Sequence, residues 1–507
     1  MKKSVKTIAL ILAITAAASS FAGCGKKQTE DDGKEVTLRW VMPDGSGKKD
    51  APAVYEKFNE ELKKYDGLGN VSVNIETIAP SEYSQKFMLM QTSGNLPDIA
   101  GTYTLKYETE VMNDTFLPLR ELVEKNAPDI EKEIPDWVFD LVTVKGDYYV
   151  IPNYQMMPAG TFNWVGFADD FEKYGNPEKM KETFWKNKYF TEECYDVIEE
   201  YLKNLKDNNK LNMGVATSSV WAWKGFESLS LSPYYVRWTD DKAEVVNIWE
   251  TPEMKLLMDR AHDWYNKGYI RKDVLSANGS EDVGKRNGWD LWVVQAIKGT
   301  EEQQEEKYGY DLTFVPVQEE YIVPNSSAAG GNGILEECEN PEKAIKFLEL
   351  MYTKKGKDLY NLLVYGIEGT HYEKVSDDRI KPVDYSVEPS SDSAYGIAKW
   401  IAGNTENAFD TTGMMENYKD YIFNDLNKNA VKSNFAGFSV DTSNVSSKIL
   451  QINTIYSEYD KPLCTGAAAN YESVYKEFMD KLKTAGNDDV KAEIQKQVDE
   501  FLKNKNK

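Results

Sequence analysis

Histidine and cysteine are scarce in this chain of 507 residues, which holds two histidines and four cysteines. His262 and His371 cannot form a histidine-rich metal site, and neither lies in a recognisable nucleophile motif, so we interpret both as structural. After the N-terminal region the remaining cysteines, Cys194, Cys338 and Cys464, are widely spaced and form no Cys-x-x-Cys pair. This spacing excludes a disulfide framework and a zinc signature. We expect three small buried hydrophobes, with a single unassigned disulfide as the alternative.

Long apolar runs are also missing. The longest, Ile8 to Ala18, has eleven residues behind Lys2, Lys3 and Lys6, whereas a membrane span takes about 20. A short apolar run after a basic start and before small residues is typical of a secretory signal, which is removed before folding. No later segment approaches the length of a membrane span.

The end of this leader, "FAGC" (Phe21 to Cys24), resembles the lipobox of bacterial lipoproteins, which normally reads Leu-Ala-Gly-Cys. The resemblance implies that Cys24 becomes the first mature residue and carries a thioether-linked diacylglycerol, so that two or more acyl chains hold the protein on a membrane. Residues 1–23 are then the signal peptide, and residues 24–34 form a flexible polar tether. The alternative is a plain secreted protein with a free N-terminal Cys24.

Positive charge is in deficit. The chain has 83 Asp and Glu against 60 Lys and Arg, a formal net charge of −23, and loss of the basic leader makes the mature chain more acidic. Such a surface repels nucleic acid and anionic lipid headgroups. The ligand is therefore expected to be neutral or cationic, and nucleic acid is not expected as a partner.

The first mature elements follow a β-α-β-α-β order. The patterns predict strands over 35–43, 71–79 and 96–103, and helices over 51–65 and 81–95, the second capped by Ser81 and ended by Gly94. This order implies a parallel sheet with helices on its faces. The chain is longer than the roughly 250 to 300 residues at which one core stops growing, so two lobes are expected.

Several motifs, in this order, resemble the extracellular solute-binding proteins of ABC importers, in the sugar-binding branch that includes maltose-binding protein. They are "NLPDIAGT" (95–102), "LPLRELVEK" (117–125), "VKGDYYVIPNY" (144–154), "YGYDLTFVPV" (308–317), "SSAAGGNGIL" (326–335) and "NPEKAIKFLELMYT" (340–353). "LYNLLVYGIEGTHY" (359–372) resembles a lipoprotein subgroup of Gram-positive bacteria. The match covers nearly the whole mature chain.

This resemblance implies a two-lobed α/β fold of the periplasmic-binding-protein type (type II), with the ligand cleft between the lobes and crossing strands as the hinge. We place the first lobe at 35–151 plus 321–372 and the second at 152–320 plus 373–507. At the C-terminus, 471–505 is predicted to form two amphipathic helices broken at Gly486.

Candidate ligand residues follow from the rule that ligands meet the loops at the carboxyl ends of strands in doubly wound sheets. In the first lobe they are Asp44 and Ser46 in "PDGSGKKD", and Tyr103 and Tyr107 after the third strand. The glycine-rich loop lacks the Gly-Lys-Ser/Thr ending of a phosphate loop. Asp98 is expected to support its loop. By resemblance, Tyr154, Met156 and Asn332 lie at the crossovers between the lobes.

In the second lobe, "LNMGVATSSVWAWKGFESL" (211–229) is interpreted as a strand, a polar turn and a helix that begins after Trp221 and Trp223. "NGWDLWVVQAIKGTEEQQEE" (287–306) is interpreted as a helix with Trp289 and Trp292 on one face and Asp290 beside them. Flat aromatic rings with polar groups at their rim suit a sugar. Packing of these tryptophans in the core is the alternative.

Two functions remain open on these residues. The resemblance implies a non-catalytic receptor, lipid-anchored on the outer face of the cytoplasmic membrane, that closes on a carbohydrate and delivers it to a permease served by a separate ATPase. It is expected to be a monomer without cofactor or metal. The alternatives are a surface glycoside hydrolase with paired carboxylates, or a binding protein of the same fold for a peptide or a polyamine.

Overall fold

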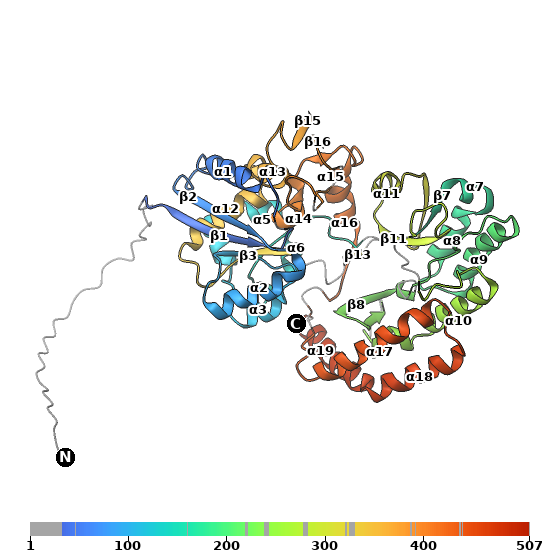
Figure 1. Ribbon diagram of the computed structural model, residues 1–507. Helices are drawn as coiled ribbons and strands as arrows, with labels where there is room; N and C mark the ends of the chain where they lie inside the picture. Colours follow the sequence, from blue (N-terminus) through green and yellow to red (C-terminus); the bar gives the residue numbers. More distant parts are fainter. Residues whose placement is uncertain are drawn as a thin grey trace, which may run out of the picture.

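A computed structural model describes residues 33–505, apart from 46, 160, 219–221, 238–242, 277–281, 320–321, 324–329, 386–387, 391, 436–437 and 439. Cys24, Ser46 and Trp221 lie outside the described residues. Figure 1 shows two lobes, each built of strands and helices.

The first lobe begins with the predicted order of strands and helices. Its elements are β1 (Val36–Met42), α1 (Ala51–Leu62), β2 (Val71–Thr77), α2 (Pro80–Ser93) and β3 (Ile99–Gly101), and the strand order is β2-β1-β3-β14-β6. The strand β1 is parallel to β2 and β3, which confirms the β-α-β-α-β unit. Helix α2 ends at Gly94 in the left-handed conformation, as expected. It begins at Pro80 after Ala79, so the prediction of Ser81 as its cap was wrong.

Two later strands complete this sheet. β14 (Gly331–Ile334) runs antiparallel to β3 and to β6 (Ile151–Pro152). The other elements before the first crossover are α3 (Tyr107–Met112), α4 (Arg120–Asn126), α5 (Ile130–Glu133), α6 (Asp136–Asp140), β4 (Thr143–Val144) and β5 (Asp147–Tyr148). After β14 come α12 (Pro341–Tyr352), the 3-10 turn Lys354–Gly356, α13 (Lys357–Tyr365), β15 (Tyr372–Ser376) and β16 (Arg379–Pro382).

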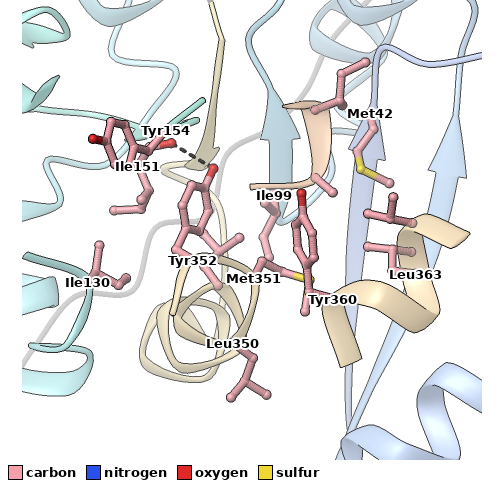
Figure 2. Packing of buried hydrophobic residues seen from close by; sticks show 14 of the residues in the cluster. Met42, Ile99, Ile130, Ile151, Tyr154, Leu350, Met351, Tyr352, Tyr360 and Leu363 are labelled. Atoms are coloured by element: carbon pink, nitrogen blue, oxygen red, sulfur yellow. Dashed lines mark hydrogen bonds between the residues drawn. The ribbon is translucent and has the colours of Figure 1, made fainter. Parts of the chain in front are cut away.

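The core of the first lobe lies between its sheet and α1, α12 and α13. Figure 2 shows Tyr352 and Tyr360 beside Ile99 and Met42 of the strands. The hydroxyl of Tyr352 donates a hydrogen bond of 2.9 Å to the carbonyl of Ile151, the dashed line in Figure 2. A smaller cluster, which includes Tyr83 and Phe87 of α2, packs on the sheet separately.

The segment after residue 372 belongs to the first lobe up to about residue 430. Ile380, Tyr395, Ile401, Phe409 and Phe423 pack in the same cluster as β1 and α12. The expected assignment of 373–430 to the second lobe therefore differs from the packing. The elements here are α14 (Lys399–Ala402), the 3-10 turn Thr405–Asn407, β17 (Asp410–Thr411), α15 (Tyr418–Asp420), a π-helix (Tyr421–Leu426) and α16 (Asn427–Asn429).

The chain passes between the lobes three times: between β6 and β7, between β12 and β14, and after β18 (Val431–Lys432). β18 pairs in parallel with β13 (Ile322–Val323), which lies in the second passage. Directly after β18, the hydroxyl of Ser433 hydrogen-bonds to the buried carboxylate of Glu227 in the second lobe. The third passage was expected at residues 372–373 and lies instead after Lys432, because a two-residue strand leaves almost no periodic pattern in a sequence.

The second lobe contains two antiparallel three-stranded sheets. In one, β7 (Thr161–Phe167) lies between β11 (Trp292–Ala296) and β12 (Leu312–Pro316). The other has the order β10-β9-β8, from β8 (Phe226–Leu231), β9 (Tyr234–Arg237) and β10 (Val245–Asn247). The helix expected after Trp223 is wrong, because β8 begins at Phe226. The helix expected over 287–306 is wrong except for its end, because β11 occupies Trp292–Ala296 and α11 begins only at Glu301. Consecutive β-branched and aromatic residues, "WVVQ" in β11, favour a strand.

The helices of the second lobe pack on these sheets. They are α7 (Ala168–Tyr174), α8 (Pro177–Lys186), α9 (Glu192–Asp207), the 3-10 turn Ile248–Glu250, α10 (Pro252–Lys267), α11 (Glu301–Tyr308), α17 (Ser446–Cys464), α18 (Tyr471–Thr484) and α19 (Asn487–Lys505). Gly486 separates α18 from α19 with a φ of +88°, as predicted. Among the described residues, no helix is both long enough and apolar enough to cross a membrane.

The scarce residues have structural roles. Cys194, Cys338 and Cys464 are free and buried, so the alternative of a disulfide among them is wrong. His371 accepts a hydrogen bond from the backbone N–H of Ile367, 2.9 Å away. His262 lies 3.0 Å from the carbonyl of Gly466. Within the described ranges, no cluster of His, Cys, Asp or Glu could hold a metal ion.

Candidate ligand-binding site

A cavity of about 190 Å³ opens in the first lobe, next to the first crossover. The lining combines aromatic, aliphatic and charged side chains, the mixture that grips a sugar ring. The lining residues are Gln155, Met156, Glu388, Lys399, Trp400, Thr405, Ala408, Phe409, Asp410, Met414, Tyr418, Lys419, Ile422 and Phe423.

Trp400 is the largest ring of this cavity. It is half-buried and meets the ring of Tyr103 edge to face, with centroids 4.7 Å apart at 85°. The next residue, Ile401, accepts a hydrogen bond of 3.1 Å from the side-chain amide of Asn332. The Trp400 backbone is therefore tied to the central sheet, which restricts where the ring can lie.

Four charged side chains line the cavity, two of each sign. Lys399 lies 3.5 Å from Glu388 and 5.8 Å from the ring centroid of Tyr418. Burial raises the pKa of Asp410 and lowers the pKa of Lys419, and each group in part counters the shift of the other. Together these groups offer hydrogen-bond donors and acceptors around a site of zero formal charge.

Asp44 connects the loop after β1 to this region. Its carboxylate accepts hydrogen bonds from the backbone N–H of Gly45 at 2.7 Å and of Ala398 at 3.2 Å. Burial raises its pKa, while these two bonds lower it. Burial, and to a smaller extent the negative charge of Asp44, raises the pKa of Tyr55 to about 12. The carboxylate thus holds the start of the segment that carries Lys399 and Trp400.

Of the predicted site residues in the first lobe, Met156 lines the cavity, and three others lie beside its lining residues. Tyr103 contacts Trp400, the ring of Tyr154 packs 5.0 Å from that of Phe423, and Asp44 holds Ala398. Asp98 supports its loop as expected, because its carboxylate accepts a 2.8 Å hydrogen bond from the N–H of Arg39.

Asn332 and Tyr107 lie in the interior. Asn332 is fully buried, accepts a 2.9 Å hydrogen bond from the indole of Trp40 and donates one of 2.8 Å to Tyr352. The hydroxyl of Tyr107 donates to the carbonyl of Val142 at 2.7 Å. The structure therefore gives both side chains a packing role, and Asn332 acts on the cavity through Ile401.

In the second lobe, Trp223 is half-buried and its ring packs against Phe162 at 6.2 Å and Tyr235 at 5.7 Å. Phe162 is the second residue of β7, directly after the first crossover. The adjacent ammonium of Lys224 donates to two carbonyls at the carboxyl end of α8. Trp223 therefore lies at the hinge side of this lobe, where a cleft residue would lie.

Trp289, Asp290 and Trp292 are interior residues. The two tryptophans are 2% and 1% exposed and pack in the core of the second lobe, which fits the core alternative. The carboxylate of Asp290 accepts hydrogen bonds from the N–H of Asn212 at 2.8 Å and of Gly214 at 2.6 Å. Burial raises the pKa of Asp290 to about 6. These contacts hold a loop rather than a ligand.

Most of the cavity lining was not predicted from the sequence: Lys399, Trp400, Asp410, Tyr418 and Lys419. Their segment has only short helices and a two-residue strand, so no hydrophobic period marks it. One feature of the sequence does mark Trp400. This residue lies in "GIAKWIAG" between Gly396 and Gly403, and both glycines adopt positive φ.

Comparison with known families and proteins gives consistent matches. A family model described as a domain of unknown function, DUF3502, matches residues 434–503, which correspond to α17, α18 and α19. A carbohydrate ABC transporter substrate-binding protein of Streptococcus pneumoniae serotype 4 (strain TIGR4) is 25% identical over 515 residues, 97% of each chain. The polygalacturonan/rhamnogalacturonan-binding protein YtcQ of Bacillus subtilis (strain 168) is 21% identical over 398 residues, 73% of this chain and 74% of that protein.

Among solved structures, the N-glycan transport solute-binding protein NgtS of Streptococcus pneumoniae has a TM-score of 0.74 at 23% identity, covering 93% of this chain and 100% of that one. The TM-score is 0.60 for the structure of NgtS in complex with Man5GlcNAc. These matches confirm the two-lobed fold and the resemblance to the solute-binding proteins of ABC importers. The matched relatives are substrate-binding proteins, which favours a binding protein over the hydrolase alternative.

Proposed function

We propose that this protein captures a neutral oligosaccharide between its two lobes and delivers it to an ABC permease. The observation that carries the proposal is the cavity formed by Met156, Trp400 and Tyr418 with two lysines and two carboxylates at its wall. Aromatic faces suit the C–H faces of a sugar, and the charged groups can hydrogen-bond to its hydroxyls. The relatives, which are described as binding carbohydrates, support this ligand class.

A neutral ligand fits the charges. Glu388 and Asp410 balance Lys399 and Lys419, so the cavity has no excess of positive charge to hold a carboxylate. The whole chain, at −23, also repels a polyanion. On this ground we favour a neutral glycan over the uronate-containing polymers after which YtcQ is named.

Hinge closure is the proposed mechanism of capture. Each lobe has its own hydrophobic core, so each can move as a rigid unit about the three crossovers. Trp223 of the second lobe would approach the ligand when the lobes close.

Lipid anchoring through Cys24, on the extracellular face of the cytoplasmic membrane, is part of the same proposal. The leader and the lipobox-like "FAGC" support it, and residues 25–34 supply a tether between the acyl chains and the first lobe. The closed lobes would then dock on permease subunits, and a separate ATPase would drive transport.

The experiment is calorimetric titration of residues 25–507 with Man5GlcNAc, other neutral oligosaccharides, oligogalacturonate, a peptide mixture and spermidine. We expect binding of a neutral sugar that is recovered uncleaved. Trp400→Ala should weaken it by about 2 kcal/mol, the cost of truncating a central aromatic contact, or roughly thirtyfold in Kd. Tyr310→Ala, which removes an exposed ring that does not line this cavity, is the control. Binding of oligogalacturonate, peptide or spermidine alone would refute the neutral-sugar assignment.

A further inference from the structure

The loop between β11 and α11 reaches from the second lobe to the first. Ile297, the first residue after β11, is 3% exposed and packs in the core cluster of the first lobe. Its carbonyl accepts hydrogen bonds from the N–H and the hydroxyl of Thr300, at 3.0 and 2.7 Å. Residues 297–300 therefore form a tight turn whose apolar end is inserted into the other lobe.

Gly299, inside this turn, touches the first lobe. Its φ is +92°, and a Cβ built on it would lie 2.2 Å from Sδ of Met415. Non-bonded heavy atoms do not approach a Cβ so closely, so a side chain at residue 299 would force the flexible thioether end of Met415 to turn away or the lobes to separate. Glycine is thus the residue that allows a thioether of one lobe to rest on the backbone of the other.

Met415 is held in place next to the cavity. The guanidinium of Arg379, in β16, donates hydrogen bonds to the carbonyls of Met414 at 2.8 Å and Met415 at 3.0 Å. Met414 lines the cavity and is 4% exposed. In Figure 1, α11 and β11 lie on the side of the second lobe that faces α15 and α16 of the first. The contact between Gly299 and Met415 therefore adjoins the proposed binding site.

We propose that the Gly299–Met415 contact restrains the two lobes relative to each other, so that Met415 influences ligand affinity through lobe closure without touching the ligand. The crossovers join the lobes covalently, and closure about them is the motion proposed above. A non-covalent contact beside the crossovers changes the free-energy difference between lobe arrangements, and thereby their populations. This inference rests on the hinge closure proposed above.

The test measures the lobes themselves and needs no sugar. Val383 in the first lobe and Leu450 in the second are 64% and 68% exposed. In a chain without Cys24, spin labels on Val383→Cys and Leu450→Cys report the inter-lobe distance by double electron–electron resonance, because the native cysteines of the lobes are buried. The variants are Gly299→Ala, Met415→Ala and the double substitution.

Gly309→Ala is the matched control. Gly309 also has a positive φ, +74°, but its Cβ would meet no atom within 4 Å. Both alanines therefore strain the backbone similarly, and only Gly299→Ala disturbs Met415. We expect Gly299→Ala and Met415→Ala to broaden the distance distribution to the same extent, the double variant to broaden it no further, and Gly309→Ala to leave it unchanged.

An unchanged distribution in both single variants would overturn the proposal. So would additive broadening in the double variant, or equal broadening by Gly309→Ala. If Gly299→Ala does not fold, Met415→Ala, which strains no backbone, carries the test by itself. Because the distance is measured without ligand, a negative result here is distinguishable from a failure to bind any sugar in the calorimetric experiment.

Discussion

Asp290→Ala is expected to destabilise the second lobe without weakening ligand binding. The carboxylate is 3% exposed and accepts the backbone N–H groups of Asn212 and Gly214. Alanine would leave the buried N–H of Gly214 without an acceptor, at a cost of about 1 to 3 kcal/mol, and would also remove the acceptor of the part-buried N–H of Asn212. Release of the buried charge offsets part of this cost, so we expect a loss of about 1 to 3 kcal/mol.

The dependence on pH has a defined sign. The pKa of Asp290 is about 6 in the folded chain, because burial disfavours its charge, and about 3.9 in an unfolded chain. A raised pKa in the folded state means that the stabilisation is complete below about pH 4 and is lost as the pH rises through about 6. The difference corresponds to about 3 kcal/mol. Asp290→Ala should abolish this component.

The assay is urea denaturation at pH 4.5, 6 and 7.5, followed by far-ultraviolet circular dichroism. Asp290→Asn keeps an acceptor oxygen for the two N–H groups and is the matched control, which should stay within about 1 kcal/mol of the wild type, the usual net value of one neutral hydrogen bond. A variant Asp290→Ala as stable as the wild type, or one that folds normally but loses sugar binding, would refute a structural role for this carboxylate.

Three further predictions concern other named residues. Asn332→Ala removes the acceptor of Trp40 and the donor to Ile401, so urea denaturation should show a loss of about 2 to 4 kcal/mol for the unpaired buried groups; an unchanged midpoint would contradict this. Lys224→Met removes the ammonium bound to the carbonyls of Phe184 and Asn187, at the end of α8. It should lower stability by about 1 to 3 kcal/mol in a thermal melt, whereas Lys496→Met, an exposed control on α19, should not. Cys24→Ser should move the full-length protein from the membrane fraction to the medium; retention on membranes would argue against the lipid anchor.

The β-α-β-α-β start of the first lobe could be predicted because its pattern is local. "VSVNIET" alternates apolar and polar residues along β2, and Gly94 ends α2 in a conformation that favours glycine. The same holds for Gly486 between α18 and α19. Where the spacing of apolar side chains and a terminating glycine indicate the same helix or strand, the sequence alone is enough to predict that element.

The residues of the candidate site were harder to predict, because whether a side chain is exposed depends on packing with residues that are distant in the sequence. The spacing of Trp289 and Trp292 would put both rings on one face of a helix, yet both are buried in the core of the second lobe, and "WVVQ" forms the strand β11. Trp400 was overlooked because the third passage between the lobes, after β18, returns the chain to the second lobe later than expected. Lobe membership depends on long-range packing, which one sequence without an alignment does not reveal.

Titration of residues 25–507 with neutral oligosaccharides, in parallel for the wild type, Trp400→Ala and Tyr310→Ala, tests the central claim most directly. The account predicts a saturable heat for the wild type with a neutral sugar, a Kd roughly thirtyfold weaker for Trp400→Ala, and no change for Tyr310→Ala. Equal affinity of the wild type and Trp400→Ala for such a sugar would show that the cavity around Trp400 is not where this protein holds its ligand.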